Sequence, residues 1–285
     1  MNTLQAPLRM NFIDDVIAGR TPLPTIPRVV QRLIAGLRRS DANLNELAAE
    51  LVHDPVLSAR VLRLANSSFY SGRRSLASIR DAVAVIGTDA LRTLVIACGV
   101  SSAFVEVPGI NLRQFWLEAV ITAATAQLLA QQLRADADGA HAAGLLSATG
   151  HLILCQSHPL AAAAEFTRYR NLRGAALAER ELAVFGVAHP AVGALWVDRL
   201  GFPREVAQAI AFCLDPAAAD GSSPLPGIVR VARDVAASVT SGDSVAAAVA
   251  KLDAALLQGL SLRDYVGAAA FAERYEQMKD LPSMA

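Results

Sequence analysis

The sequence predicts an all-α protein of two helical lobes. Apolar residues recur at helical spacing through most of the chain, and helix-capping residues stand at the starts of these segments. Alternating β-branched runs joined by hairpin turns are missing. Pro108-Gly109 separates two groups of helical segments, so we expect the lobes to meet near residue 108.

The first group begins with TIPRVVQRLIAGLRR, whose apolar side chains share one helical face. Asp54-Pro55 then places a capping residue before a first-turn proline. Ser78 and Asp81 form a capping box, and Gly87 is a plausible helix end. Thr88 can cap the next segment, which is apolar nearly all round and is expected at the centre of its lobe.

The second group begins with a long predicted helix over residues 112–133. Shorter helices are expected over 140–147, 150–157, 159–170, 174–185, 228–239 and 261–279, with two more starting at His189-Pro190 and Phe202-Pro203. We therefore divide the chain into an N-terminal segment (1–20), an N-terminal lobe (21–107), a second lobe (108–215) and a helical extension (216–285).

The composition predicts a cytoplasmic protein with a large core. Hydrophobic residues make up 53% of the 285 residues, charged residues 18%, and the formal net charge is zero. The mean hydropathy of +0.36 is high, but the most apolar windows are shorter than the ~20 residues a membrane-spanning helix needs. Without a basic excess we expect no nucleic-acid partner. The three widely spaced cysteines are expected to be reduced core thiols.

Catalytic motifs are missing from the sequence. The five histidines include no pair at i, i+4 on one helix, and phosphate-binding glycine loops and a nucleophile elbow are absent. His53-Asp54 could be a ligand pair, but helix capping already accounts for the aspartate. We therefore expect no catalytic residue, no metal and no cofactor.

The segment AGLLSATGHLIL, residues 143–154, raises a question about chemistry. An apolar helix is interrupted there, and proteins often place a ligand at such a break. Ser147 and Ala148 at the break carry no charge and are poor metal ligands.

Two neighbouring stretches, DPVLSARVLRLANSSFYS and SLASIRDAVAVIGTDALRTLVIA, resemble the HDOD family, the HD-related output domains of bacteria. The resemblance covers about residues 20–215 and includes the opening formed by Leu23, Pro24 and Pro27. Positions that match the first motif are Asp54, Pro55, Leu57, Arg60, Leu62, Arg63, Leu64, Ala65, Asn66, Ser67 and Tyr70.

The resemblance implies that the second lobe is similar to the helical core of HD phosphohydrolases. Those enzymes hold metal with a histidine, a His-Asp pair and a later aspartate. In this chain Glu118 stands where the first histidine is expected, Ser147 and Ala148 replace the His-Asp pair, and His189 remains. So few ligands cannot hold a hydrolytic metal. We therefore expect a collapsed, apolar former cavity, with Glu118 partly exposed or bonded to a neighbour such as His189.

The function implied is a non-enzymatic signalling or adaptor protein whose metal-less HDOD domain binds another protein. That partner would be a signalling protein of a cyclic-dinucleotide or two-component pathway, and a homodimer is compatible with the alanine-rich helices. The candidate interaction surface comprises Arg60, Arg63, Asn66, Ser67, Tyr70, Arg73, Arg74 and Arg80. The alternative for these residues is structural: internal ion pairs for the arginines and a helix-end turn for Asn66 and Ser67.

The sequence leaves two other functions open. The chain could sense a nucleotide such as cyclic di-GMP between the lobes, with Arg73, Arg74 and Arg80 binding its phosphates. It could also be a divergent metal-dependent phosphohydrolase with an unrecognised site.

Overall fold

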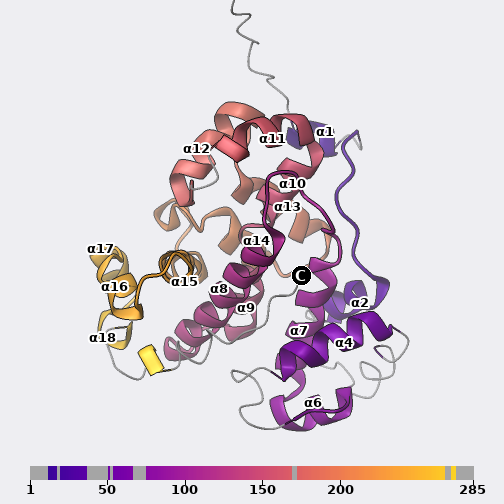
Figure 1. The fold of residues 1–285 in the computed structure, drawn as a ribbon. Helices are drawn as coiled ribbons and strands as arrows, with labels where there is room; N and C mark the ends of the chain where they lie inside the picture. The colour runs from indigo at the N-terminus through magenta and orange to yellow at the C-terminus, as the bar shows by residue number, and fades with distance from the viewer. Residues whose placement is uncertain are drawn as a thin grey trace, which may run out of the picture.

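A computed structural model describes residues 12–17, 20–36, 51, 54–66, 75–168, 172–266 and 271–273. Within these ranges every regular element is a helix and no strand occurs, which confirms the predicted all-α class. Figure 1 shows two groups of helices, one of α2, α4, α6 and α7 and a larger one around α8. None of the helices in the described part of the chain is long and apolar enough to cross a membrane.

The N-terminal lobe is organised around α7 (Thr88–Ser101), which packs against α2 (Arg28–Gly36), α4 (Pro55–Ala65) and α6 (Ile79–Ile86). The predicted caps at Asp54 and Ser78 are present, but the predicted cap at Thr88 is wrong, because Thr88 is the first residue of its helix and no side chain caps it. Asp54 Oδ1 accepts a hydrogen bond from the Leu57 backbone N–H at 2.9 Å, and Ser78 and Asp81 form their capping box. The α7 helix begins at Thr88, with Gly87 in the cap position at a φ of 84°.

The second lobe has the long helix α8 at its centre, in contact with α9 and α15. Its helices are α8 (Leu112–Gln132), α9 (Ala137–Leu146), α10 (Thr149–Ser157), α11 (Pro159–Arg168), α12 (Gly174–Phe185), α13 (His189–Arg199), α14 (Arg204–Ala211) and α15 (Leu225–Thr240). A short 3-10 turn, η1 (Pro216–Ala218), precedes α15. The predicted extension thus contributes α15 to the packing of the second lobe. The small helices α16 (Val245–Ala250), α17 (Ala254–Gly259) and α18 (Arg263–Val266) lie beside it (Figure 1).

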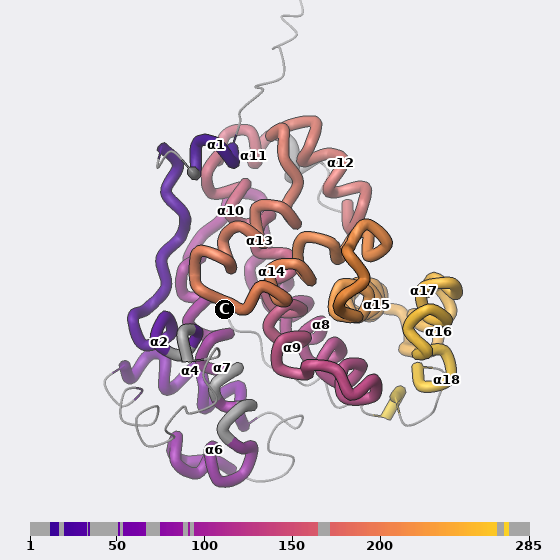
Figure 2. Tube along the Cα trace, turned by 180° about the vertical axis from the view of Figure 1, so that it is seen from behind, coloured from indigo at the N-terminus to yellow at the C-terminus, as the bar shows by residue number. Residues whose placement is uncertain are grey.

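The chain before α2 connects the two lobes. Helix α1 (Phe12–Ile17) lies beside α11, and residues 20–27 run from there to α2 (Figures 1 and 2). The Trp196 indole N–H donates to the Pro24 carbonyl at 3.0 Å, and Arg199 donates to the Val16 carbonyl at 3.2 Å. These bonds hold the chain before α2 against α13.

Buried aromatic rings mark the place where the lobes meet. Phe104, between the two lobes in sequence, lies 6.1 Å from the ring of Trp116 and 5.6 Å from that of Trp196. All three side chains are almost completely buried. The lobes therefore share one continuous hydrophobic core. The three cysteines are buried free thiols, as the sequence predicted.

Candidate functional site

The interrupted segment of the sequence is a tight turn between two buried helices. Helix α9 ends at Leu146 and α10 begins at Thr149. The hydroxyl groups bind locally, because Ser147 Oγ donates to the Gly144 carbonyl at 2.9 Å and Thr149 Oγ1 to the Leu146 carbonyl at 2.7 Å. Both hydroxyls thus have a backbone acceptor, and the Ser147 carbonyl is available to another partner.

A glycine after the turn brings α10 against α13. A Cβ on Gly150 would lie 2.0 Å from the carbonyl oxygen of His189 and 2.7 Å from the Gly193 nitrogen, so no larger residue fits. This close approach places the rings of His151 and His189 6.5 Å apart, nearly perpendicular to each other.

Glu181 of α12 connects these two histidines. The Nδ1–H of His151 donates to its Oε1 at 2.6 Å, and the Nδ1–H of His189 donates to its Oε2 at 2.7 Å. The backbone N–H of His189, at the start of α13, also donates to Oε2 at 2.7 Å. The carboxylate is completely buried and both of its oxygens accept hydrogen bonds. We call His151, Glu181 and His189 the buried triad.

The burial and the hydrogen bonds of the triad determine its protonation. Burial alone would raise the pKa of Glu181, but His189 and the hydrogen bonds from both imidazoles outweigh burial and lower this pKa from 4.5 to about 2. Burial lowers the pKa of His189, and the nearby Arg233 lowers it further, against the opposing effect of Glu181. Near neutral pH, Glu181 is therefore an anion and His189 is neutral with its proton on Nδ1.

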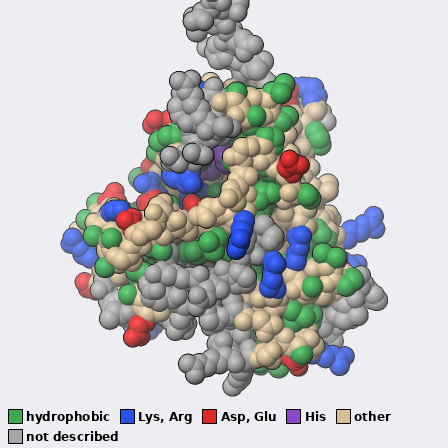
Figure 3. Space-filling model, in the orientation of Figure 1, with side chains coloured by type: hydrophobic (Ala, Val, Ile, Leu, Met, Phe, Trp, Pro, Cys, Tyr) green, Lys and Arg blue, Asp and Glu red, His purple; other side chains and the backbone are tan. Residues whose placement is uncertain are grey.

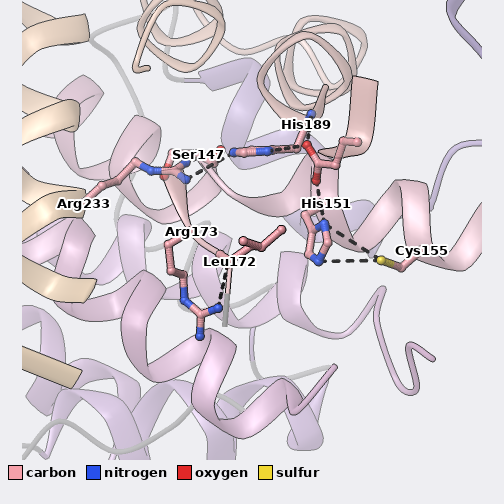
Figure 4. Close-up of polar contacts among 8 residues, drawn as sticks. Ser147, His151, Cys155, Leu172, Arg173, His189 and Arg233 are labelled. Carbon is pink, nitrogen blue, oxygen red and sulfur yellow. Dashed lines mark hydrogen bonds and ion pairs between the residues drawn. The ribbon is translucent and has the colours of Figure 1, made fainter. Parts of the chain in front are cut away.

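Arg233 of α15 extends the triad toward a cavity. Its Nη1 donates to the Ser147 carbonyl at 2.8 Å, and its Nη2 lies 3.2 Å from His189 Nε2. With the His189 proton on Nδ1, Nε2 has the lone pair that accepts this hydrogen bond. Figure 4 shows the resulting row from Arg233 through His189 and His151 to Cys155.

The cavity beside Arg233 has a volume of about 420 Å³. One wall is the start of α8 with Asn111, Gln114 and Glu118. The other is formed by Leu172, Arg173, Gly174 and Leu177, at the start of α12. The α9–α10 turn, the two histidines and Arg233 complete the lining. Figure 3 shows histidine atoms in a recess of the molecular surface, beside charged side chains.

The HDOD domain model matches residues 23–216 of the chain, more than half of its length. The chain belongs to the HDOD family. This match confirms the resemblance in the sequence. Helix α15, which supplies Arg233, lies beyond the matched residues of the HDOD domain.

Solved structures of similar proteins share the fold. A protein from Shewanella amazonensis SB2B, named provisionally as a phosphohydrolase, is 28% identical with a TM-score of 0.71 over 95% of this chain and 98% of its own. An HDOD domain protein of unknown function from Geobacter sulfurreducens is 22% identical with a TM-score of 0.76 over 96% and 98%. A provisionally named signal transduction protein from Marinobacter aquaeolei VT8 is 24% identical with a TM-score of 0.71 over 98% and 60%. No curated protein matches the chain.

The metal implied by HD phosphohydrolases does not fit the residues of this HDOD domain. Three N–H groups already use the Glu181 oxygens, and a guanidinium lies against Ser147 and His189. Across the described ranges, no group of three or more His, Cys, Asp or Glu side chains could hold a metal ion.

At the positions that match the metal ligands of HD phosphohydrolases, one expectation is wrong and one is confirmed. Ser147 and Ala148 line the open cavity described above, so the predicted collapsed, apolar core is wrong. Its lining includes polar side chains and Arg233. Glu118 is partly exposed as expected, but it does not bind His189. Its Oε2 lies 3.9 Å from Arg173 Nε and 3.5 Å from Thr240 Oγ1, while Glu181 is the carboxylate that binds His189.

The candidate interaction surface is described only in part. Ser67, Tyr70, Arg73 and Arg74 lie outside the described residues, as does His53 of the His-Asp pair. Arg63 and Arg80 are exposed on α4 and α6, and Arg60 is half-buried. Arg80 does not line the cavity.

Asn66 has a structural position at the end of α4. Its side-chain amide donates to the Leu62 and Leu76 carbonyls at 2.9 Å each, and its oxygen accepts from the Leu76 N–H at 2.7 Å. The side chain thus ties the end of α4 to the segment before α6, which agrees with the structural alternative for this residue.

The sequence analysis missed Glu181, His151 and Arg233 as members of one site. A carboxylate on the inner side of a predicted helix is a weak signal, because a glutamate in a helix is most often exposed. The sequence predicted the helix start at His189-Pro190. It did not predict the hydrogen bond of His189 to Glu181, 8 residues earlier, because that contact depends on the turn between α12 and α13.

Proposed function

We propose that this HDOD protein is a non-catalytic signal-transduction module that acts by binding a partner protein. The observation that carries the proposal is the position of Arg233, whose guanidinium binds the Ser147 carbonyl and His189 Nε2. A fixed organic cation thus stands beside the positions from which related hydrolases would hold a metal.

The electrostatics of this position work against metal-dependent hydrolysis. A hydrolytic metal needs about three protein ligands and an open position for water. Ser147 and Ala148 offer no side-chain ligand of that kind, and the Glu181 oxygens accept three N–H groups. A second positive charge about 4 Å from Arg233 would be repelled by about 4 kcal/mol per unit charge at an effective dielectric of about 20.

The partner surface that we propose lies on α4 and α6 and includes the exposed Arg63 and Arg80. The other predicted residues, Ser67, Tyr70, Arg73 and Arg74, come between these helices in the sequence and lie outside the described residues. Exposed arginines suit an acidic protein partner. The pathway of that partner, a cytoplasmic location and a homodimer stay predictions.

One alternative function has support from a relative. The Shewanella amazonensis protein, 28% identical, is provisionally named a phosphohydrolase, which favours a divergent hydrolase. The purified chain should therefore be tested for bound metal and for turnover of bis(p-nitrophenyl) phosphate, with and without added Mn²⁺ or Fe²⁺. We expect less than stoichiometric metal and no turnover. Hydrolysis that follows metal loading would end the non-catalytic proposal.

The binding half of the proposal needs a separate experiment. Proteins captured from the source bacterium should be purified and their binding measured by biolayer interferometry. We expect the Arg63→Glu/Arg80→Glu variant to bind the true partner at least about tenfold more weakly, because it reverses two charges. The control is Arg204→Glu, which changes an exposed arginine of α14 in the other lobe. Equal binding by both variants would contradict the proposed surface.

A further inference from the structure

The open cavity beside the buried triad is lined by two arginines, Arg173 and Arg233, and by several polar side chains. We propose that it binds a small molecule carrying a phosphoryl group, of about the size of a mononucleotide, with Arg233 as the main anion-binding residue. This inference goes beyond partner binding and does not depend on it.

Arg233 has donors to spare for an anion. A guanidinium has five N–H donors. The contacts of Arg233 with described residues are to the Ser147 carbonyl, to His189 Nε2 and, at 3.8 Å, to Cys213 Sγ. These use at most three N–H groups, so two remain for a ligand in the cavity that Arg233 lines. The bonds to the protein also hold the guanidinium in place, so little order is lost on binding.

The contacts of Arg233 also show that it makes no direct ion pair with the buried carboxylate. Glu181 is the nearest anion in the triad, but its oxygens face the two imidazoles and the His189 N–H. The neutral ring of His189 stands between Glu181 and Arg233. The positive charge is thus presented toward the cavity, where a phosphate oxygen could form charge-assisted hydrogen bonds.

The opposite wall of the cavity adds a second cation and a helix start. Arg173 and Gly174 line the cavity at the first turn of α12. This 12-residue helix has no side-chain cap on its first N–H groups, and neither has α10 at Ala148, which also lines the cavity. The carbonyl end of α9 adjoins the start of α10 and offsets it, so the positive end of α12 is the helix end that reinforces the two arginines, and this combination favours an anion.

The remaining lining suits the rest of a nucleotide-sized molecule. Phe115 and Leu177 supply apolar surface, and Asn111 and Gln114 supply amide groups that could bind sugar or base atoms. A volume of about 420 Å³ lies within the range of about 300–1,000 Å³ typical of small-molecule sites.

Glu118 is the acidic side chain that lines this cavity. The proposal predicts in which direction its removal changes the affinity for phosphate. Its Oε2 is 3.9 Å from Arg173 Nε, and its side chain is 26% exposed. A bound phosphate would be repelled by this carboxylate and would compete with it for Arg173. Removing the charge of Glu118 should therefore strengthen phosphate binding.

The experiment is calorimetric titration of the full chain with inorganic phosphate, ribose 5-phosphate, AMP and GMP, with adenosine as the probe without phosphate. We expect at least one phosphate-bearing probe to bind saturably and adenosine to bind far more weakly. Arg233→Met should weaken that binding about ten- to hundredfold, as expected for loss of charge-assisted hydrogen bonds. Glu118→Gln should tighten it about two- to fivefold. The control Arg204→Met, outside the cavity, should bind like the unaltered chain.

Arg233→Met could fail to fold, because Arg233 contacts the triad. The Arg173→Met and Glu118→Gln variants change only the partly exposed wall, so they carry the test in that case, with weaker and tighter binding expected respectively. The proposal is overturned if none of the four phosphate-bearing probes binds at millimolar concentration, or if Glu118→Gln weakens binding. Turnover of a bound probe would refute the non-catalytic function and leave the binding site intact.

Discussion

Replacing Glu181 by glutamine tests whether the buried triad stabilises the second lobe. The change keeps the shape of the side chain and removes its charge. One amide oxygen can still accept both N–H groups of His189, but the new amide N–H₂ would face the Nδ1–H of His151. The proton of His151 must then move from Nδ1 to Nε2. In the unaltered chain, Nε2 lies 3.7 Å from Cys155 Sγ.

The cost follows from the three hydrogen bonds of the carboxylate. A hydrogen bond to a charged group contributes about 1.5–3 kcal/mol, against about 0.5–1.5 kcal/mol for a neutral one. Losing about 1 kcal/mol at each of three bonds predicts that Glu181→Gln lowers the free energy of unfolding by about 3 kcal/mol. Glu181→Ala, which leaves three buried donors unpaired, should cost about 3–9 kcal/mol.

Urea unfolding at pH 7, followed by far-UV circular dichroism, measures both changes. The pKa of Glu181 is lowered from 4.5 to about 2. Its contribution is therefore complete above pH 4.5 and is lost only as the pH falls toward 2. The matched control is Glu179→Gln, an exposed glutamate on the same helix, with an expected change below about 0.5 kcal/mol. If Glu181→Gln is as mild as the control, the triad does not hold α10, α12 and α13 together.

Three further predictions concern packing, a helix end and pH. Gly150→Ala should cost several kcal/mol or prevent folding, because its Cβ would lie 2.0 Å from the His189 carbonyl oxygen, whereas Gly259→Ala, with nothing within 4 Å, should be harmless in thermal melts. Asn66→Ala should lower the free energy of unfolding by about 1–3 kcal/mol through the loss of its backbone hydrogen bonds, and an unchanged urea midpoint would contradict this role. Burial lowers the pKa of His141 from 6.5 to about 4. The unfolded chain takes up the proton first, so the fold should lose about 3 kcal/mol as the pH falls from 6.5 to 4, and His141→Met should remove this part of the pH dependence.

Helix caps were readable from the sequence because they act over a few residues. Asp54 binds the N–H of Leu57, and Ser78 and Asp81 bind each other's backbone, whatever the rest of the chain does. The prediction that Ser147 and Ala148 stand at the positions of a His-Asp pair rests likewise on two neighbouring residues and on the family resemblance. The family membership was predicted from the motifs of the N-terminal lobe, and the match of the HDOD domain model over residues 23–216 confirms it.

By itself, then, the sequence determined an all-helical HDOD domain with the small residues Ser147 and Ala148 between two of its helices. Only the tertiary structure decided which groups surround that turn. Glu181 reaches His151 across 30 positions of sequence, and Arg233 reaches Ser147 across 86. The physical reason is that a buried charge must find its partners wherever packing brings them, and no local spacing encodes which helices will meet. The cavity could not be predicted from the sequence for the same reason, because its lining comes from helices as far apart in the chain as α8 and α15.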